Sequence, residues 1–254
     1  MRSESAIWNY YETLARAWGP QHWWPAETPF EVILGAYLTQ NTAWTNVEKA
    51  FANLRSVDAI SVGAIRRLPL SELEQLIRPA GYFRQKAARL KTFVSFLDQH
   101  YRGSLARMFA QPTDRLRAEL LALNGVGPET ADSILLYAGH HEVFVVDAYT
   151  RRIFERHGIT TSKSSYEEIR QLVERALANS VGPAPVEPGA GNPAPPIHRP
   201  SQMSCALRSG QAQVLNEFHG LIVQVGKHHC LSRVPACKGC PLAPFLAKDG
   251  PILS

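Results

Sequence analysis

The run LALNGVGPETADSILL, residues 121–136, joins two predicted helices through a very tight turn. Gly125 and Gly127 permit backbone torsions that other residues resist, and they let the main chain approach another molecule closely. Pro128 suits the first position of the second helix, where its missing N–H costs nothing. The turn should therefore present backbone N–H groups at the positive end of a helix dipole, which suits a phosphate oxygen. An ordinary joint between two helices is the alternative, because G-x-G alone is a weak signal.

Asp147 lies between a short extended run, Val143–Val146, and a predicted helix, Ala148–Arg156. A carboxylate in this place can stabilise a developing positive charge, or it can orient and activate water. The simpler role is that of an N-cap for the helix. The two roles are compatible, and we expect Asp147 to act in catalysis.

Most of the chain has apolar residues at helical spacing, and a long strand-type alternation is missing. The sequence therefore predicts an all-α fold. Helices are predicted over Ala6–Trp18, Glu31–Leu38, Thr45–Leu54, Leu70–Ile77, Gln85–His100, Asp114–Leu123, Tyr166–Ala178 and Ala212–Val225. Residues 182–200 are crowded with Pro, Gly and Ala and have no apolar face, so we interpret them as a flexible inserted loop, with a functional lid as the alternative.

The overall composition restricts the class of protein. The chain has 254 residues, of which 45% are hydrophobic and 19% charged, which excludes a disordered or membrane-spanning protein. A net charge of +5 favours a polyanionic partner only mildly. The N-terminus lacks an apolar signal core, and no stretch reaches the roughly 18 apolar residues of a membrane helix. We expect a cytoplasmic, nucleoid-associated protein that does not contact a membrane.

Residues Phe30 to Arg152 resemble the endonuclease III superfamily of base-excision DNA glycosylases. The resemblance rests on the hairpin run LNGVGPETA, on Val145-Val146-Asp147 and on the upstream run LTQNT, residues 38–42. It implies two helical lobes with a cleft for DNA and the base between them. One lobe would span residues 30–140, with the helix-hairpin-helix at about 113–140, and the other residues 1–29 plus 141–254. The implied partner of a monomeric chain is double-stranded DNA with a damaged base.

Within the superfamily, the chain is more similar to the bacterial 3-methyladenine glycosylases related to endonuclease III. The similarity lies in Trp23-Trp24-Pro25, in residues 34–42 and in residues 127–132. It implies that Asp147 is the catalytic carboxylate. It also implies a base pocket with the extruded base between Trp24 and Trp44, Pro25 at its edge and Glu129 beneath.

Cationic alkylated purines would stack well on such electron-rich indole faces. Stacking is worth about 1–3 kcal/mol per base, so two aromatic rings offset most of the cost of flipping. The alternative is that the tryptophans are core residues at a lobe junction, which we expect for Trp23 but not for Trp24 and Trp44.

Glu129 stands where the bifunctional members carry a lysine, which attacks the sugar to form a Schiff base. A carboxylate cannot form an imine, and no lysine occurs between Lys91 and Lys163. The resemblance therefore implies a monofunctional glycosylase that uses water and leaves an abasic site. A lysine distant in sequence but near in space is the alternative.

The resemblance also implies contacts to DNA. The hairpin residues Gly125, Val126, Gly127 and Thr130 would hold a phosphate, which positions the protein without reading sequence. Gln40, with Asn41 beside it, matches the polar residue that enters the gap left by the flipped nucleotide. A helix C-cap is the alternative for Gln40.

The superfamily's iron–sulfur loop has the spacing C-x6-C-x2-C-x5-C. Cys230, Cys237 and Cys240 fit the first three positions, but the fourth is Leu246. Because a cubane cluster normally takes four thiolates, a [4Fe–4S] cluster is doubtful here. The options are a degenerate loop over residues 230–246 without a cluster, a labile or three-cysteine cluster, substitution by Cys205, and a site using His229 or zinc. The loop would still present Lys227, Arg233 and Lys238 to phosphates.

The leading hypothesis is thus a monofunctional glycosylase acting on alkylated purines. A second enzyme hypothesis is an endonuclease III-type activity on oxidised pyrimidines with weak lyase activity. A third is a catalytically silent DNA-binding hairpin protein, which the retained Asp147 argues against.

Overall fold

A computed structural model describes residues 2–178 and 198–252 of the chain. Within these residues the fold is all-α, without a strand, as the sequence predicts. The chain forms two compact units, one from Met1–Pro25 and His140–Ser254 and the other from Ala26–Gly139. The predicted insertion at 182–200 lies outside the described residues, apart from its last three. No described helix combines the length and the apolar character that crossing a membrane requires.

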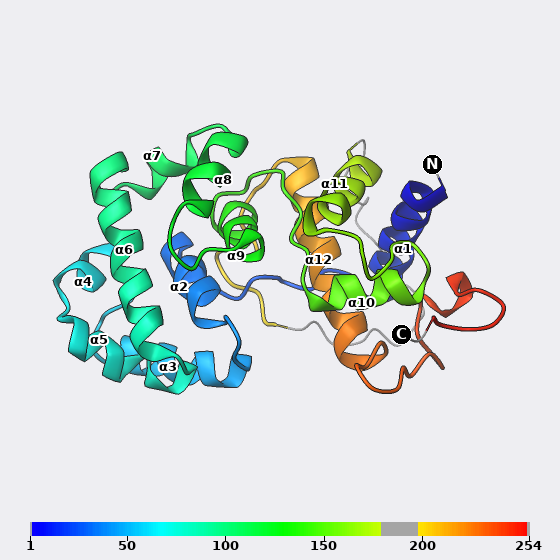
Figure 1. Cartoon of the computed structure of the whole chain (residues 1–254), viewed down its shortest axis with the longest axis horizontal. Coiled ribbons are helices and arrows are strands. Elements are labelled where there is room, and N and C mark those ends of the chain that lie inside the picture. Colours follow the sequence, from blue (N-terminus) through cyan, green and yellow to red (C-terminus); the bar gives the residue numbers. More distant parts are fainter. Residues whose placement is uncertain (1, 179–197, 253–254) are drawn as a thin grey trace. The chain divides into compact units, whose positions relative to one another are not determined.

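The hairpin unit, Ala26–Gly139, is organised around one buried helix, α2. Its elements are α2 (Pro29–Leu38), α3 (Trp44–Ser56), α4 (Val62–Arg67), α5 (Leu70–Leu76), η1 (Arg78–Ala80), α6 (Phe83–Tyr101), α7 (Leu105–Phe109), α8 (Thr113–Leu121), α9 (Pro128–Ser133) and η2 (Ile134–Ala138). Every residue of α2 from Phe30 to Leu38 is buried, because α6, α9 and η2 pack around it (Figure 1). A helix that is apolar all round belongs in a core.

The terminal unit, Met1–Pro25 with His140–Ser254, is organised around α12. Its elements are α1 (Arg2–Trp18), α10 (Ala148–Arg156), α11 (Tyr166–Leu177), α12 (Gly210–His228) and η3 (Ala243–Phe245). The helices α1, α10 and α11 all pack on α12 (Figure 1). Gly226 permits the close approach of α10, since a Cβ there would lie 2.1 Å from Tyr149 Cδ1. Both chain ends therefore contribute to one core.

Local sequence signals explain where several helices begin. Thr28 caps α2 through its side chain, with Pro29 following at the first helical position. Ser165 and Glu168 form a capping box at the start of α11. The short helices α4 and α7 are absent from the sequence prediction, although Ser61 and Ser104 cap them. These helices, of six and five residues, carry too few apolar positions to show a period.

Candidate active site

Asp147 is the N-cap of α10, and its two carboxylate oxygens have different surroundings. Oδ1 accepts hydrogen bonds from the backbone N–H of Thr150 at 2.8 Å and from Thr150 Oγ1 at 2.9 Å. Oδ2 lies 3.6 Å from Nε2 of His219 on α12. Burial by itself would raise the pKa of Asp147, but the His219 ring and the Thr150 hydrogen bonds lower it below its ordinary value. The structure therefore favours an ionised carboxylate.

The segment before α2 brings Trp23 and Trp24 to α12, the helix that carries His219. Asn216 Nδ2 donates to the carbonyl oxygen of Trp23 at 2.6 Å, and the rings of Trp23 and His219 lie 5.5 Å apart. Gly220 makes room, since a Cβ there would lie 3.0 Å from Trp23 Cβ. Trp24 packs edge-on against Trp23, with 5.4 Å between the ring centroids, and is 7% exposed. Trp23, which we expected to be purely structural, is thus a neighbour of the Asp147 site.

The hairpin differs from its sequence interpretation in one detail. Gly125 has a φ of +78°, in the region that favours glycine, whereas Gly127 has an ordinary φ of −90°. The expectation that Gly127 is needed for an unusual torsion is wrong. Its distinguishing property is space, because a Cβ added there meets nothing within 4 Å. Gly127 is also the N-cap of α9 and has no side chain with which to cover the first amides.

Neither of the other two predicted phosphate contacts, Val126 and Thr130, presents an exposed side chain. Val126 is 6% exposed, and its N–H already donates to the carbonyl of Leu123. Thr130 is 8% exposed, and its Oγ1 accepts from Gln40 Nε2 at 2.9 Å. The backbone N–H groups at the start of α9 are therefore the groups that suit a phosphate.

Gln40 braces the hairpin from the loop after α2. Its Nε2 also donates to the carbonyl oxygen of Gly125 at 3.0 Å. Its Oε1 accepts from Arg89 Nη1 at 3.0 Å. Asn41, the next residue, is exposed and has a φ of +52°. The C-cap of α2 is Thr39, so the capping role considered for Gln40 belongs to its neighbour.

A buried ion pair ties the two hairpin helices together. Asp132 on α9 is fully buried and accepts from Arg117 on α8, from Nε at 2.7 Å and from Nη2 at 3.1 Å. This fork-to-fork geometry is the strongest form of the Arg–carboxylate pair. Asp132 is thus a structural residue of the hairpin.

The remaining predicted pocket residues lie in both units. Trp24 and Pro25 belong to the terminal unit, and Trp44 and Glu129 to the hairpin unit. Trp44 is the first residue of α3, and its Nε1 donates to Glu48 Oε1 at 3.1 Å. Glu129 is exposed in the first turn of α9. The shared pocket stays a prediction.

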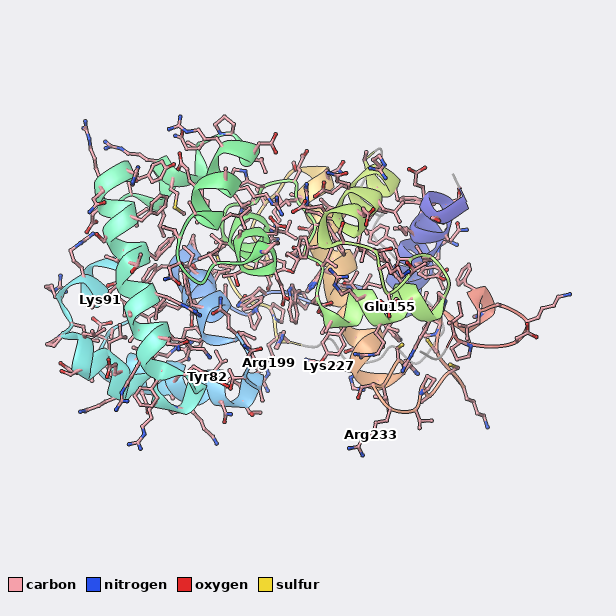
Figure 2. All side chains as sticks on the ribbon, viewed as in Figure 1. Tyr82, Lys91, Glu155, Arg199, Lys227 and Arg233 are labelled. Atoms are coloured by element: carbon pink, nitrogen blue, oxygen red, sulfur yellow. The ribbon has the colours of Figure 1, made fainter. Side chains whose placement is uncertain are left out.

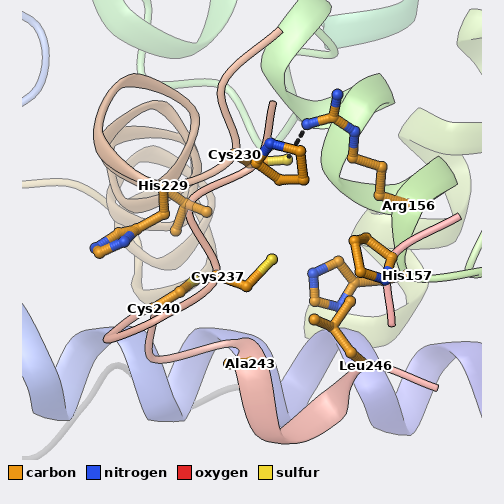
Figure 3. A pocket seen from close by; sticks show the side chains of 11 residues that line it. Arg156, His157, His229, Cys230, Cys237, Cys240, Ala243 and Leu246 are labelled. Carbon is orange, nitrogen blue, oxygen red and sulfur yellow. Dashed lines mark hydrogen bonds between the residues drawn. The ribbon is translucent and has the colours of Figure 1, made fainter. Parts of the chain in front are cut away.

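The three clustered cysteines line a small cavity near the C-terminus (Figure 3). Cys230, Cys237 and Cys240 face it together with His157 and Leu246. The cavity volume is about 20 Å³, room for about one water molecule. No three His, Cys, Asp or Glu side chains converge on a metal-sized point within residues 2–178 and 198–252. With leucine at the fourth position, these residues do not fit a four-thiolate cubane.

Two arginines from α10 bond this loop. Arg156 donates from Nη1 to Cys230 Sγ at 3.3 Å and to the Leu231 carbonyl at 2.6 Å, and from Nη2 to the Ser232 carbonyl at 2.9 Å. Arg152 Nε donates to the Cys230 carbonyl at 2.7 Å. Arg233, by contrast, extends from the loop into solvent (Figure 2).

Sequence reasoning missed the residues that support the site. These residues all lie on predicted helices: His219, Arg89, Arg117 and Arg156. Each contacts a residue that is between 15 and 74 positions away in the sequence. For His219 a weak signal existed, since it is a polar residue in the apolar middle of a helix. No spacing in the sequence indicates that His219 and Asp147 are partners.

The comparisons with known proteins agree with this architecture. The model of the "HhH-GPD superfamily base excision DNA repair protein" family matches residues 34–179. The "Putative DNA repair glycosylase MJ1434" of Methanocaldococcus jannaschii is 39% identical over 241 residues, covering 94% of each chain.

Two solved structures are similar in fold. The Helicobacter pylori 3-methyladenine DNA glycosylase MagIII, bound to 1,N6-ethenoadenine, has a TM-score of 0.67 at 28% identity and covers 89% of this chain and 97% of its own. A non-covalent endonuclease III–DNA complex has a TM-score of 0.70 at 22% identity, covering 96% and 95%. The family match and the 39% identical relative agree with the hairpin described above. The chain belongs to the HhH-GPD superfamily of base excision DNA repair proteins.

Proposed function

We propose that this protein is a monofunctional DNA N-glycosylase. It uses water to release an alkylated purine such as 3-methyladenine from duplex DNA and leaves an abasic site. The observation that carries the proposal is Glu129, exposed in the first turn of α9 where a lysine nucleophile would stand. Without an amine at this position, the hairpin cannot supply a Schiff base.

The lysines of the hairpin unit support this interpretation. That unit has three lysines, Lys49, Lys86 and Lys91. Lys86 Nζ donates to the carbonyls of Leu38 and Ala80, at 2.9 and 2.8 Å. Lys91 Nζ donates to the carbonyls of Ile65 and Leu68. Two of the three amines are thus occupied as caps for backbone carbonyls.

The proposed hydrolysis assigns the chemistry to Asp147. Water adds to C1′ of the sugar as the C1′–N bond breaks, and the bonding electron pair leaves with the base and neutralises its positive charge. Asp147 stabilises the cationic sugar and takes the proton that the water loses. Oδ2 is the oxygen for this role, because Oδ1 is committed to Thr150.

An alkylated purine is the substrate class that the indole chemistry of the predicted base-binding residues favours. Indole rings attract a cation, and a cationic base is a good leaving group that needs no strong general acid. The similarity to MagIII, whose structure holds a modified adenine, supports the same substrate class.

We infer the DNA contacts of the hairpin unit from the hydrogen bonds that its polar groups already make within the protein. The amides that begin α9 hold a phosphate, and Gly127 lets the strand approach. Asn41 enters the duplex gap, because the Gln40 amide already bonds Gly125, Thr130 and Arg89.

Base release from a panel of duplexes tests the proposal. The panel contains methylated purines, oxidised pyrimidines and deaminated bases, and free base is measured by chromatography at a fixed salt concentration. We expect release of methylated purines, strand cleavage only after alkali, and no covalent adduct on borohydride reduction. An adduct, or a nick without alkali, would show lyase activity. Tight DNA binding without release of any base would identify a non-catalytic protein.

A further inference from the structure

The imidazole of His219 is the group that faces the reactive oxygen of Asp147. Nε2 lies 3.6 Å from Oδ2, and the two side chains are 4% and 13% exposed. A polar group at this separation influences a buried carboxylate strongly. His219 comes from α12 and Asp147 from the start of α10, so the pair also links the two helices.

Packing holds the His219 ring in place. It lies 5.5 Å from the Trp23 ring on one side and 6.0 Å from the Phe144 ring on another. Trp23 itself is held on α12 because Asn216 Nδ2 donates to its carbonyl oxygen at 2.6 Å. It also packs against Gly220, where the absence of a side chain leaves room for it. A ring enclosed in this way keeps one orientation, as a positioning role requires.

We propose that His219 is a positioning residue for Asp147, which orients Oδ2 and keeps the carboxylate ionised when DNA covers the site. The inference rests on the proposed function, because it concerns the same hydrolysis. Bound DNA displaces water and brings negative phosphates, and both changes favour a protonated carboxylic acid. The His219 imidazole beside Oδ2 opposes both, because its interaction with the carboxyl lowers the pKa of Asp147. Only the ionised carboxylate can accept the proton of the attacking water.

The other titratable groups around the pair have partners of their own. Tyr166 on α11 accepts the Val146 N–H at 3.3 Å through its hydroxyl oxygen. Glu217 on α12 accepts the Gln21 N–H at 3.0 Å, and burial raises its pKa. His198 packs 5.5 Å from Trp23, and burial, aided by Lys227, lowers its pKa to about 4. Above pH 5, His198 is therefore neutral and does not assist Asp147.

The pH dependence of single-turnover base release in His219→Gln tests the inference. We expect the wild type to keep its activity to lower pH than the variant. Because His219 lowers the pKa of Asp147, its loss should raise the midpoint of the acid limb by about 1–3 pH units. Above that limb the variant should approach the wild-type rate. A uniform loss of rate at every pH, with the midpoint unchanged, would show a merely structural role and overturn the inference.

Three controls make the result specific. His157→Gln removes a half-buried histidine of the same unit, whose Nδ1 bonds the Tyr10 hydroxyl at 2.7 Å, and should leave the acid limb in place. His228→Gln removes an exposed histidine from α12 and should change neither rate nor midpoint. In an Asp147→Asn background, His219→Gln should reduce the rate no further, since His219 acts through Asp147.

A measurement without substrate separates this inference from the proposed function. NMR titration of the Asp147 carboxyl in the DNA-free protein should give a higher pKa in His219→Gln than in the wild type. If the wild type releases no base but the carboxyl titration shifts, the proposed function fails and the coupling stands. If the wild type is active and neither titration nor acid limb shifts, His219 is not a positioning residue.

Discussion

Asp147 is both a structural and a reactive residue, and the structure assigns each role to a separate oxygen. Oδ1 caps α10 through Thr150, and Oδ2 faces His219. Asparagine caps helices about as well as aspartate but cannot accept a proton. Asp147→Asn should therefore lower the single-turnover rate of base release by about 10²–10⁴-fold while keeping the cap of α10.

The exposed Asp114, in the first turn of α8, offers a matched control. Asp114→Asn removes the same charge from the same chain and should not change the rate. An Asp147→Asn variant that releases base as fast as the wild type would remove the carboxylate from the mechanism.

The neighbouring residues Gln40 and Asn41 should respond differently to truncation. Gln40→Ala removes hydrogen bonds to Gly125, Thr130 and Arg89, so it should loosen the hairpin and lower the melting temperature. Net hydrogen bonds contribute about 0.5–1.5 kcal/mol each. Asn41→Ala removes an exposed side chain at a φ of +52°, so it should cost about 1–2 kcal/mol of backbone strain. It should also slow base flipping, measured by a fluorescent base analogue opposite the lesion. Equal flipping rates in wild type and Asn41→Ala would contradict the assignment of Asn41.

At the scale of elements, the hairpin depends on the ion pair between α8 and α9. Asp132→Asn leaves the Arg117 guanidinium, whose side chain is only 13% exposed, without its carboxylate. Breaking a buried pair from one side costs about 3–5 kcal/mol. We expect the free energy of unfolding, measured with urea, to fall by that amount. Arg115→Gln is the control, since Arg115 is 64% exposed and its pair with Glu119 should be worth about 0–1 kcal/mol.

The cysteine loop should be stable without a metal. We propose that Arg152 and Arg156 replace the cluster as the support of residues 230–246, because their guanidinium groups bond the loop at Cys230, Leu231 and Ser232. A chelator should leave the melting temperature unchanged, and Arg156→Lys should lower it. Arg233→Lys, on the exposed side of the same loop, should not. Stoichiometric iron and sulfide in the purified protein, lost together with stability, would show that a cluster is bound.

The same elements show how far sequence reasoning extends. The period of apolar residues predicts the long helices, because each buries one face or, in α2 and the middle of α12, every face. The hairpin and Asp147 were predictable as local motifs. The supporting contacts were not predictable. Gln40 and Gly125 are 85 positions apart, and Asp147 and His219 are 72 apart. Contacts over such separations depend on the packing of whole helices. Gly127 was misjudged because sequence cannot separate a glycine needed for torsion from one needed for space.

For the molecule as a whole, the excess of positive charge is small in each unit. The hairpin unit has 13 Lys and Arg against 11 Asp and Glu, and the terminal unit has 14 against 11. Neither unit has the large excess that would make DNA binding a bulk electrostatic effect. The salt dependence of binding should therefore come from a few individual side chains.

Lys227, Arg233 and Lys238, all exposed in the terminal unit, are the candidates the sequence singles out (Figure 2 labels the first two). Each phosphate contact contributes about 0.9 to the slope of log Kobs against log salt, so replacing all three by glutamine should reduce that slope by about 2.7. Fluorescence anisotropy on an undamaged duplex between low and moderate salt measures it. The rate of base release at saturating protein should stay at the wild-type value, because none of the three belongs to the Asp147 site. An unchanged slope would show that Lys227, Arg233 and Lys238 do not contact phosphates.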